Sequence, residues 1–456
     1  MIKVYAVFDI GKTNKKFFLF DVHYNEVYRD YVNLPLTVDE DGFETEDLQE
    51  LLVWIKKTFD TVLEDPKFDV KTLNFSSYGA SLVHLDYQGK PLTPLYNYTK
   101  DIPSQVLEDF YSKYGDPLTF ACETASPVTG MLNSGMQLYW IKKMRPEIFT
   151  QIKYSLHLPQ YLSYIFTGIP LSEYTSIGCH TSLWNFDEQK YQQWVHKEGM
   201  DLILPPIVSS STSINMIYKG KKIKIGVGIH DSSAALMPYI RSKNKPFLLL
   251  STGTWSIALN PFNTESLSGD DIVNNCLNYL RIDGERVKAS RFFMGNEYRV
   301  EVEKLCGFYQ KEYGYDCKVL FDQGIYLRLI ANNRGYFKFG GKTLEHFTEE
   351  TDLNLFSNFE EAYHQLLIEL MDIQVTTIKN AIGSSKIQKI FIDGGFTDND
   401  VFMKLISHHF SSFEVLSTHS PLGSALGAAM VIAGKQINSR FLKENYRMKK
   451  LDPLLF

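Results

Sequence analysis

The sequence has few cysteines, and no pairing pattern connects them. Its 456 residues include only Cys122, Cys179, Cys276, Cys306 and Cys317, and no two of these form a Cys-x-x-Cys motif. An odd number of widely spaced cysteines is typical neither of a zinc knuckle nor of a disulfide framework. We therefore expect reduced thiols that lie in the cores of the protein.

Long apolar runs and a strong charge bias are also absent. No apolar stretch reaches membrane-spanning length, and Asp9 interrupts the first apolar segment before a signal peptide could be complete. The chain has 47 Lys and Arg against 53 Asp and Glu, a net charge of −6. This balance argues against a surface for nucleic acid. We expect a cytoplasmic protein with no nucleic-acid or membrane partner, and the sequence leaves a homodimer open.

The length of the chain predicts two domains, because a single hydrophobic core rarely extends past roughly 250–300 residues. Strands and helices alternate along both halves, which predicts an α/β fold. The pattern restarts near Tyr218, so we divide the chain into domains 1–220 and 221–456. In the second domain, apolar residues at helical spacing predict a long helix over Phe359–Ile382, ended by Gly383.

A polar turn between two apolar strands is the first indication of function. Val4–Ile10 is predicted to be a buried strand, Gly11–Asn14 a tight turn and Phe17–Phe20 the returning strand. The backbone N–H groups of such a turn, with the hydroxyl and amide side chains at its end, could bind phosphate oxygens, and Asp9 could bind a magnesium ion. The alternative is an ordinary hairpin, because Asp and Gly are common turn residues.

The same residues also fit a relaxed Walker A pattern. Ala6 to Thr13 have its spacing, and Gly11-Lys12-Thr13 match its last three positions. A phosphate-binding loop of that kind leads into a helix whose N-terminus faces the phosphates. Because Phe17–Phe20 is predicted to continue as a strand, we favour the hairpin and keep the P-loop as the minor alternative.

Two later segments also place small or hydroxyl-bearing residues at a strand end. Ser251-Thr252-Gly253-Thr254-Trp255 is a polar turn between two apolar strands, and it could bind the far side of the same phosphates. Ile392–Asn399 is a strand that runs into Gly394 and Gly395, where missing side chains would let an adenine ring approach the backbone. Two facing phosphate turns, one per domain, would place ATP in a cleft between the domains.

Together these segments resemble the FGGY family of carbohydrate kinases, within the superfamily of sugar kinases, chaperone ATPases and actin. The resemblance extends to Gly228–Ala235, which looks like the segment that holds the family's catalytic base, and to Pro421–Ala429, which is similar to its C-terminal small-residue helix. It implies two ribonuclease H-like α/β domains with an active-site cleft between them. It also implies phosphorylation of a sugar hydroxyl, with ATP and Mg²⁺ bound in that cleft.

The resemblance also implies roles for individual residues. Asp231 is the implied general base, although the sequence alone also allows an N-cap for the helix that starts at Ser232. Asp9 is the implied metal ligand. The implied nucleotide site comprises Asp9, Gly11, Lys12, Thr13, Asn14, Lys15, Ser251, Thr252, Gly253, Thr254, Gly394, Gly395 and Asn399. The implied sugar site comprises Ser77, Tyr78, Gly79, His230 and Asp231.

The substrate indicated by the resemblance is a ketose. His230 and the segment Leu158–Gly168 look like those of the rhamnulose and fuculose kinases, which favours L-rhamnulose or L-fuculose. The chain departs from these relatives at Tyr96–Lys100, where they carry an Arg and an Asp, and at Ser81, where rhamnulose kinases would place an acid. Loss of charged groups changes which sugar a pocket selects. A pentulose or polyol substrate therefore stays open, as does a non-catalytic sugar sensor or scaffold of the same fold.

Overall fold

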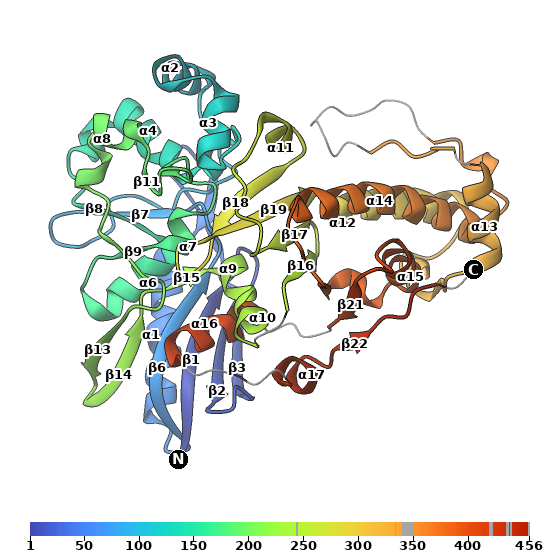
Figure 1. Ribbon diagram of the computed structural model, residues 1–456. Coiled ribbons are helices and arrows are strands. Elements are labelled where there is room, and N and C mark those ends of the chain that lie inside the picture. The colour runs from blue at the N-terminus through green and yellow to red at the C-terminus, as the bar shows by residue number, and fades with distance from the viewer. Residues whose placement is uncertain are drawn as a thin grey trace.

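Two seven-stranded sheets form the framework of the computed structural model, which describes residues 1–242, 245–332, 334–339, 351–418, 423–434, 437 and 440–454. Figure 1 shows the first sheet, built largely from N-terminal strands, and the second sheet next to the long helices α12 and α14. Each sheet mixes parallel and antiparallel neighbours. The expected α/β fold with two domains is therefore confirmed.

The first sheet has the strand order β13-β14-β6-β1-β2-β3, with β15 beside β6. Its central strand β1 is buried on both faces, because its alternate residues enter two different cores. Helix α1 (Leu48–Glu64) covers one face. The strands are β1 (Ile2–Ile10), β2 (Lys15–Asp21), β3 (Glu26–Val32), β6 (Phe68–Ser77), β13 (Ser213–Tyr218), β14 (Lys221–Gly226) and β15 (Ile229–His230).

The second sheet has the strand order β18-β19-β17-β16-β20-β21-β22. Its strands are β16 (Phe247–Thr252), β17 (Ser256–Asn260), β18 (Cys276–Leu280), β19 (Arg286–Phe292), β20 (Lys389–Gly394), β21 (Glu414–Ser417) and β22 (Lys449–Lys450). Four helices lie on its outer side, namely α12 (Met294–Phe308), α13 (Gln323–Asn332), α14 (Phe359–Ile382) and α15 (Asp400–His409). Helix α14 has the bounds that the sequence predicts, and Gly383 ends it with a positive φ of 52°. Within the described ranges, no helix is long and apolar enough to cross a bilayer.

A layer of four helices joins the two sheets, and two of them, α9 and α16, are rich in small residues. It consists of α9 (Asp231–Ala235), α10 (Met237–Arg241), α16 (Gly423–Ala433) and α17 (Phe441–Asn445). One hydrophobic core contains residues of these helices together with residues of both sheets, and Figure 1 shows α16 against β1 and β6. The C-terminal helix therefore returns to the first sheet. The expected small-residue helix starts at Gly423 in the described residues, and Pro421 and Leu422 lie outside them.

The first domain also carries a mostly helical region with an aromatic core of its own. The Phe110 ring contacts the rings of Phe120, Tyr139 and Trp194 there. Its helices are α2 (Ser104–Tyr114), α3 (Pro117–Thr124), α4 (Ser134–Met144), α5 (Pro146–Phe149), α6 (Leu158–Thr167), α7 (Tyr174–Ile177) and α8 (Gln193–Lys197). Its short strands are β7 (Leu82–Leu85), β8 (Tyr154–His157), β9 (Ser172–Glu173), β10 (Trp184–Asn185), β11 (Lys190–Tyr191) and β12 (Ile207–Val208), and a separate hairpin near the N-terminus comprises β4 (Leu36–Val38) and β5 (Glu44–Glu46).

The strand pairing favours a domain boundary later in the chain than residue 220. Strands β13 and β14 form one antiparallel hairpin in which Tyr218 pairs with Lys221, and β15 pairs with β6. A division after residue 220 would separate β13 from its hairpin partner. The first sheet continues as far as His230, so we propose a boundary after that residue.

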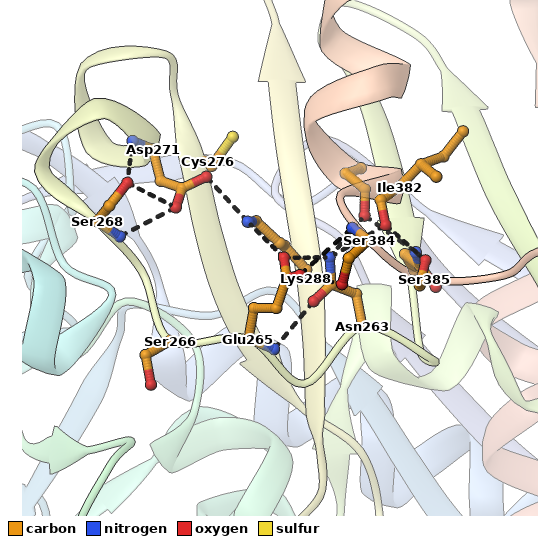
Figure 2. Close-up of polar contacts among 12 residues, drawn as sticks. Asn263, Glu265, Ser266, Ser268, Asp271, Cys276, Lys288, Ile382, Ser384 and Ser385 are labelled. Atoms are coloured by element: carbon orange, nitrogen blue, oxygen red, sulfur yellow. Dashed lines mark hydrogen bonds and ion pairs between the residues drawn. The ribbon is translucent and has the colours of Figure 1, made fainter.

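A network of polar contacts fastens the loop after β17 to the rest of the second domain, as Figure 2 shows. Buried Lys288 on β19 lies 2.9 Å from the carboxylate of Asp271 in α11 (Gly269–Val273) and 3.6 Å from that of Glu265. The Asn263 amide donates a hydrogen bond of 3.2 Å to the carbonyl of Ile382 at the end of α14. One ammonium group thus neutralises two carboxylates beside a helix end.

We expect Lys288→Met to lower the free energy of unfolding by about 1–3 kcal/mol, because it leaves two partly buried carboxylates without their cation. The midpoint of urea unfolding measures this loss. Lys190→Met is the matched control, since the Lys190–Glu188 pair is exposed and a pair of that kind contributes roughly 1 kcal/mol or less. Equal losses in the two variants would contradict a stabilising role for the Lys288 network.

Candidate active site

The first polar turn is a β-hairpin. Ile10 pairs with Lys15 across β1 and β2, and the Gly11 N–H donates a hydrogen bond of 2.9 Å to the carbonyl of Asn14. The chain returns as strand β2 rather than as a helix, so the structure excludes the P-loop alternative. The side chains of Thr13 and Asn14 are exposed at the tip of the turn, where a ligand could reach them.

Asp9 is a partly buried carboxylate near the end of β1. It accepts a hydrogen bond of 3.0 Å from the Ser424 hydroxyl of α16 and pairs with Lys16 across the hairpin. Burial, and then the negative charge of Asp231, raise the pKa of Asp9 to about 6. The two carboxylates are therefore near each other, and a divalent cation between ligand phosphates and Asp9 would offset their repulsion.

The donor set around Asp9 fits magnesium bound with a phosphate ligand. Among the described residues, no group of three or more His, Cys, Asp or Glu side chains is arranged to hold a metal ion. Mg²⁺ is commonly held by one or two carboxylates, with the remaining oxygens coming from water and substrate phosphates. A site centred on Asp9 matches that pattern.

Asp231 is the first residue of α9, directly after β15. Its carboxylate accepts a hydrogen bond of 2.5 Å from the Ser232 N–H and lies 3.3 Å from the His230 ring. About a third of the side chain, 33%, is exposed. The N-cap position of α9 belongs to His230, so Asp231 is not the cap that the alternative interpretation expected. The Ser232 bond nevertheless holds the carboxylate in one orientation.

Gly79 and Cys179 pack against His230. The Cys179 sulfur lies 3.2 Å from Nε2 of His230, and the His230 N–H donates a hydrogen bond of 2.9 Å to the Thr175 hydroxyl. A Cβ at Gly79 would lie 2.8 Å from the Cys179 sulfur and 3.4 Å from the His230 ring, so a larger residue there would displace these side chains. Cys179 is buried, as expected, and burial raises the pKa of its thiol well above the usual value.

Two lysines and two tyrosines surround the buried carboxylate of Glu46. Glu46 accepts hydrogen bonds from the Lys15 ammonium at 3.0 Å and from the Tyr78 hydroxyl at 2.9 Å. The ammonium of Lys12 lies 3.9 Å from the same carboxylate, 5.5 Å from the ring centre of Tyr78 and 5.1 Å from that of Tyr98. The Lys15 ammonium is thus bound to the Glu46 carboxylate, whereas that of Lys12 lies between the rings of Tyr78 and Tyr98.

The Tyr96–Lys100 stretch has a structural role. The Lys100 ammonium forms ion pairs of 2.5 Å with both Asp39 and Asp41, and the Asn97 amide donates a hydrogen bond of 2.9 Å to the Glu44 carbonyl. These contacts anchor the β4–β5 hairpin, which ends at Glu46. The stretch therefore positions the carboxylate that holds Lys15 and Tyr78.

The second polar turn is also a hairpin, and Thr252 joins it to β20. The Gly253 N–H donates a hydrogen bond of 3.0 Å to the Trp255 carbonyl, which closes the turn. The Thr252 hydroxyl donates to the Asp393 carbonyl at 2.5 Å and accepts from the Phe396 N–H at 3.2 Å. Thr252 therefore holds the glycine turn after β20 in place.

Asp393 is a second partly buried carboxylate, at this end of the second sheet. Burial raises its pKa to about 6, and hydrogen bonds from Ser251 and Tyr239 oppose that rise. The Tyr239 hydroxyl lies 3.3 Å from it. Ser251 and Asp393 are direct neighbours in the parallel β16–β20 pair.

The third segment forms one wall of a cavity of about 410 Å³, within the usual range for a small-molecule site. Gly394 has a φ of 91°, and a Cβ there would lie 1.8 Å from the Thr252 carbonyl, so the turn requires glycine. A Cβ at Gly395 would meet no atom of the described residues within 4 Å, which leaves the cavity wall open there. The cavity is lined by Gly253, Thr254, Gly295, Tyr298, Asp316, Cys317, Val319, Leu320, Gly395, Phe396, Asp398, Asn399 and Asp400.

The structure thus brings some of the sequence-predicted residues together and places others in supporting roles. The cavity unites Gly253, Thr254, Gly395 and Asn399, although Asn399 also caps α15 and donates to the Tyr363 hydroxyl at 2.8 Å. The Ser77 hydroxyl is buried and bonds to the Tyr78 carbonyl. Sequence reasoning missed Glu46, Tyr98, Asp393 and the cavity residues of α12 and the 315–320 segment. It also expected core cysteines throughout, whereas Cys317 is exposed at the cavity.

Comparisons with known proteins show the family of the chain. The N-terminal domain of the FGGY family of carbohydrate kinases matches residues 4–236, and the family's C-terminal domain matches residues 244–440. A rhamnulokinase of Halalkalibacterium halodurans is 24% identical over 282 residues, which cover 54% of this chain and 52% of the relative. The chain thus spans about half the length of that curated relative.

Solved structures share the fold over nearly the whole chain. A carbohydrate kinase from Novosphingobium aromaticivorans is 23% identical, with a TM-score of 0.80 over 98% of this chain and 96% of that chain. A ligand-bound xylulose kinase from Lactobacillus acidophilus is 16% identical, with a TM-score of 0.77 over 99% of this chain and 94% of that chain. Since the two domain matches leave few residues unmatched, the chain belongs to the FGGY family of carbohydrate kinases.

Proposed function

We propose that the protein is an ATP-dependent kinase that phosphorylates a sugar hydroxyl, with Asp231 as the general base. The observation that carries the proposal is the pairing of Asp231 with Asp9. The Asp231 carboxylate is held by the Ser232 N–H, and its charge contributes to the raised pKa of the partly buried Asp9. A base beside a metal-binding carboxylate is the arrangement that phosphoryl transfer to an alcohol requires.

The nucleotide would bind across both hairpin turns. The first turn would contribute the Gly11–Asn14 backbone and the second Gly253 and Thr254, while the cavity beside Gly395 would take the adenosine. Mg²⁺ at Asp9 would offset the negative charge of the phosphates. Lys15 and Thr252 would act indirectly, by holding their turns in shape.

In the proposed reaction, Asp231 accepts the proton of the sugar hydroxyl. The hydroxyl oxygen forms its bond to the terminal phosphorus of ATP as the bond from that phosphorus to ADP breaks. The contact from Ser232 keeps the Asp231 carboxylate oriented before the sugar arrives. Domain closure around both substrates would exclude water, which would otherwise compete as the acceptor.

We further propose a ketose substrate, with L-rhamnulose and L-fuculose as the first candidates. The named activity of the Halalkalibacterium halodurans relative supports rhamnulose, whereas that of the Lactobacillus acidophilus neighbour supports a pentulose. Tyr78, Gly79 and His230 lie near Asp231 and would form the sugar side of the site. Tyr98 would also belong to the sugar side. The pKa of its hydroxyl is raised first by burial, then by the charge of Glu46 and then by that of Asp231, so the three groups are near one another.

Lys12 is proposed to face the sugar, since it lies against Tyr78 and Tyr98. We expect Lys12→Ala to raise the KM for the sugar about tenfold, the loss of a desolvated cation–π contact, and to change the KM for ATP by less than about twofold. Steady-state kinetics with each substrate varied in turn measure both constants. Lys3→Ala, an exposed lysine of the same hairpin, is the control. A rise in the KM for ATP alone would instead indicate that Lys12 binds the phosphates, as expected from the sequence.

A coupled ADP-release assay tests the proposed function. L-rhamnulose, L-fuculose, L-ribulose, xylulose and glycerol are offered in turn with MgATP, and sugar phosphate is measured in the same samples. We expect ADP and sugar phosphate to form in equal amounts with at least one ketose. Slow hydrolysis that no sugar accelerates, or none, would favour the non-catalytic scaffold. The ion pair and hydrogen bond made by Lys100 and Asn97 give the Tyr96–Lys100 stretch a structural use that a catalytic protein also allows.

A further inference from the structure

Arg291 is a cation on β19 of the second sheet, and it has no role in the reaction proposed above. It pairs with Ile257 on β17. Ile257 pairs with Ser251 on β16, and Ser251 pairs with Asp393 on β20. These four residues form one row across the sheet, on the face that packs toward the first domain. The row ends beside the second phosphate turn, so the sheet directs the Arg291 side chain toward the region between the domains.

The positive charge of Arg291 has no carboxylate partner in the described part of the chain. Two other cations of the same strand are paired, Arg286 with Asp187 at 2.9 Å and Lys288 with Asp271 at 2.9 Å. Nε of Arg291 is buried and makes no hydrogen bond to any described residue. A partly buried guanidinium without a counter-ion is unfavourable unless an anion from outside the chain neutralises it.

An aromatic ring holds this guanidinium next to the second turn. Its central carbon lies 5.5 Å from the ring centre of Trp255, the residue that follows Thr254. The Trp255 ring packs on Phe293 with 4.5 Å between ring centres. The stack fixes the direction of the arginine and leaves its N–H groups available to an acceptor.

On its other side Arg291 faces the residues around the proposed base. Burial holds the pKa of His180 well below its usual range, and the charge of Arg291 lowers it further. Burial raises the pKa of Tyr279, with the charge of Asp231 adding to the rise and that of Arg291 opposing it. The Tyr279 ring lies 5.9 Å from that of His230. Arg291 therefore lies between the second turn and the Asp231 region.

We propose that Arg291 binds the terminal phosphate of the nucleotide and stabilises the charge that spreads over it during transfer. This inference rests on the proposed function. The bond from the sugar oxygen to phosphorus forms, the bond from phosphorus to the ADP oxygen breaks with its electron pair leaving on ADP, and the sugar proton passes to Asp231. Arg291 exchanges no proton, and its forked N–H groups match the phosphate oxygens. A cation so placed acts on the transferring group, where it is most effective.

The test compares nucleotides with and without a terminal phosphate. Calorimetry measures the binding of MgADP and of the Mg²⁺ complex of β,γ-imido-ATP to the wild type and to Arg291→Met, Arg291→Lys and Arg299→Met. Arg299, an exposed arginine of α12 paired with Glu303, is the matched control. We expect Arg291→Met to bind MgADP as the wild type does, within about twofold, and the imido analogue at least about tenfold more weakly. We expect its turnover to fall by about 10²–10³ and that of Arg291→Lys by less.

The outcomes separate this inference from the function on which it rests. If the wild type binds the imido analogue and Arg291→Met keeps the wild-type ratio of the two nucleotide affinities, the role of Arg291 is overturned. The proposed function is not affected by that result. Equal weakening of MgADP and the analogue also overturns the role of Arg291, because a merely structural residue would act on both. If Arg291→Met does not fold, the same ratio is read from Arg291→Lys. A wild type that binds neither nucleotide overturns the proposed function as well.

Discussion

Replacing Asp231 by asparagine is expected to lower turnover by about 10²–10⁴, the usual contribution of a general base, while the protein stays folded. Asparagine keeps the size of the side chain and can still accept the hydrogen bond from the Ser232 N–H. It cannot take the proton of the sugar hydroxyl. Sugar-phosphate formation at saturating sugar and MgATP measures the loss, and the thermal midpoint checks that the fold is intact.

Asp270→Asn is the matched control for this experiment. Asp270 also lies in the first turn of a short helix, α11, but it is exposed and outside the site. We expect its turnover to be unchanged. Near-normal phosphorylation by Asp231→Asn would remove Asp231 from the role of base. A rise in the KM for sugar with normal turnover would make Asp231 a binding residue only.

The second large effect is expected from Gly427→Ala in α16. A Cβ at Gly427 would lie 1.8 Å from the carbonyl of Ala234 in α9, and neither backbone can rotate away. The two helices must separate, which moves Ser424 away from Asp9 and shifts the helix that begins at Asp231. We expect a loss of about 1–3 kcal/mol in the free energy of unfolding. We also expect turnover to fall by about 10²-fold, as misplacement of a catalytic group by about 1 Å can cause.

Thermal unfolding and turnover are measured together for this variant and for Gly307→Ala. Gly307 lies inside α12, and a Cβ there would meet no atom within 4 Å. Alanine at that position is expected to be neutral or to stabilise the helix by up to about 1 kcal/mol. Similar behaviour of the two variants would show that the α9–α16 contact does not position the site.

The backbone frame of the site could be predicted from local sequence. Both hairpins, the turn at Gly394 and the helix Phe359–Ile382 follow from patterns within short windows, in which alternating or helically spaced apolar residues meet turn residues. These elements carry Asp9, Thr254 and Gly395 to their places. The prediction succeeded because each element depends on residues near one another in sequence.

The partners of the polar side chains could not be predicted in that way. Glu46 directly precedes the N-cap residue Asp47, so its sequence context indicated only the start of a helix. The structure instead puts it at the end of β5 and against Lys15, 31 residues earlier. Thr252 likewise bonds to Asp393 across 141 residues, so a hydroxyl assigned to a ligand holds two turns together.

The sequence by itself determined the two-domain α/β class, the two polar hairpins and the order of the segments that mark the family. Only the tertiary structure decided that β14 and β15 belong to the first sheet and that α16 returns to that sheet. It also decided that Lys15 has a carboxylate partner, whereas Arg291 has none among the described residues. The physical reason is the range of the interactions. Strand and helix formation depends on near neighbours, whereas charge pairing, burial and close backbone contact depend on residues that meet only after the sheets have packed.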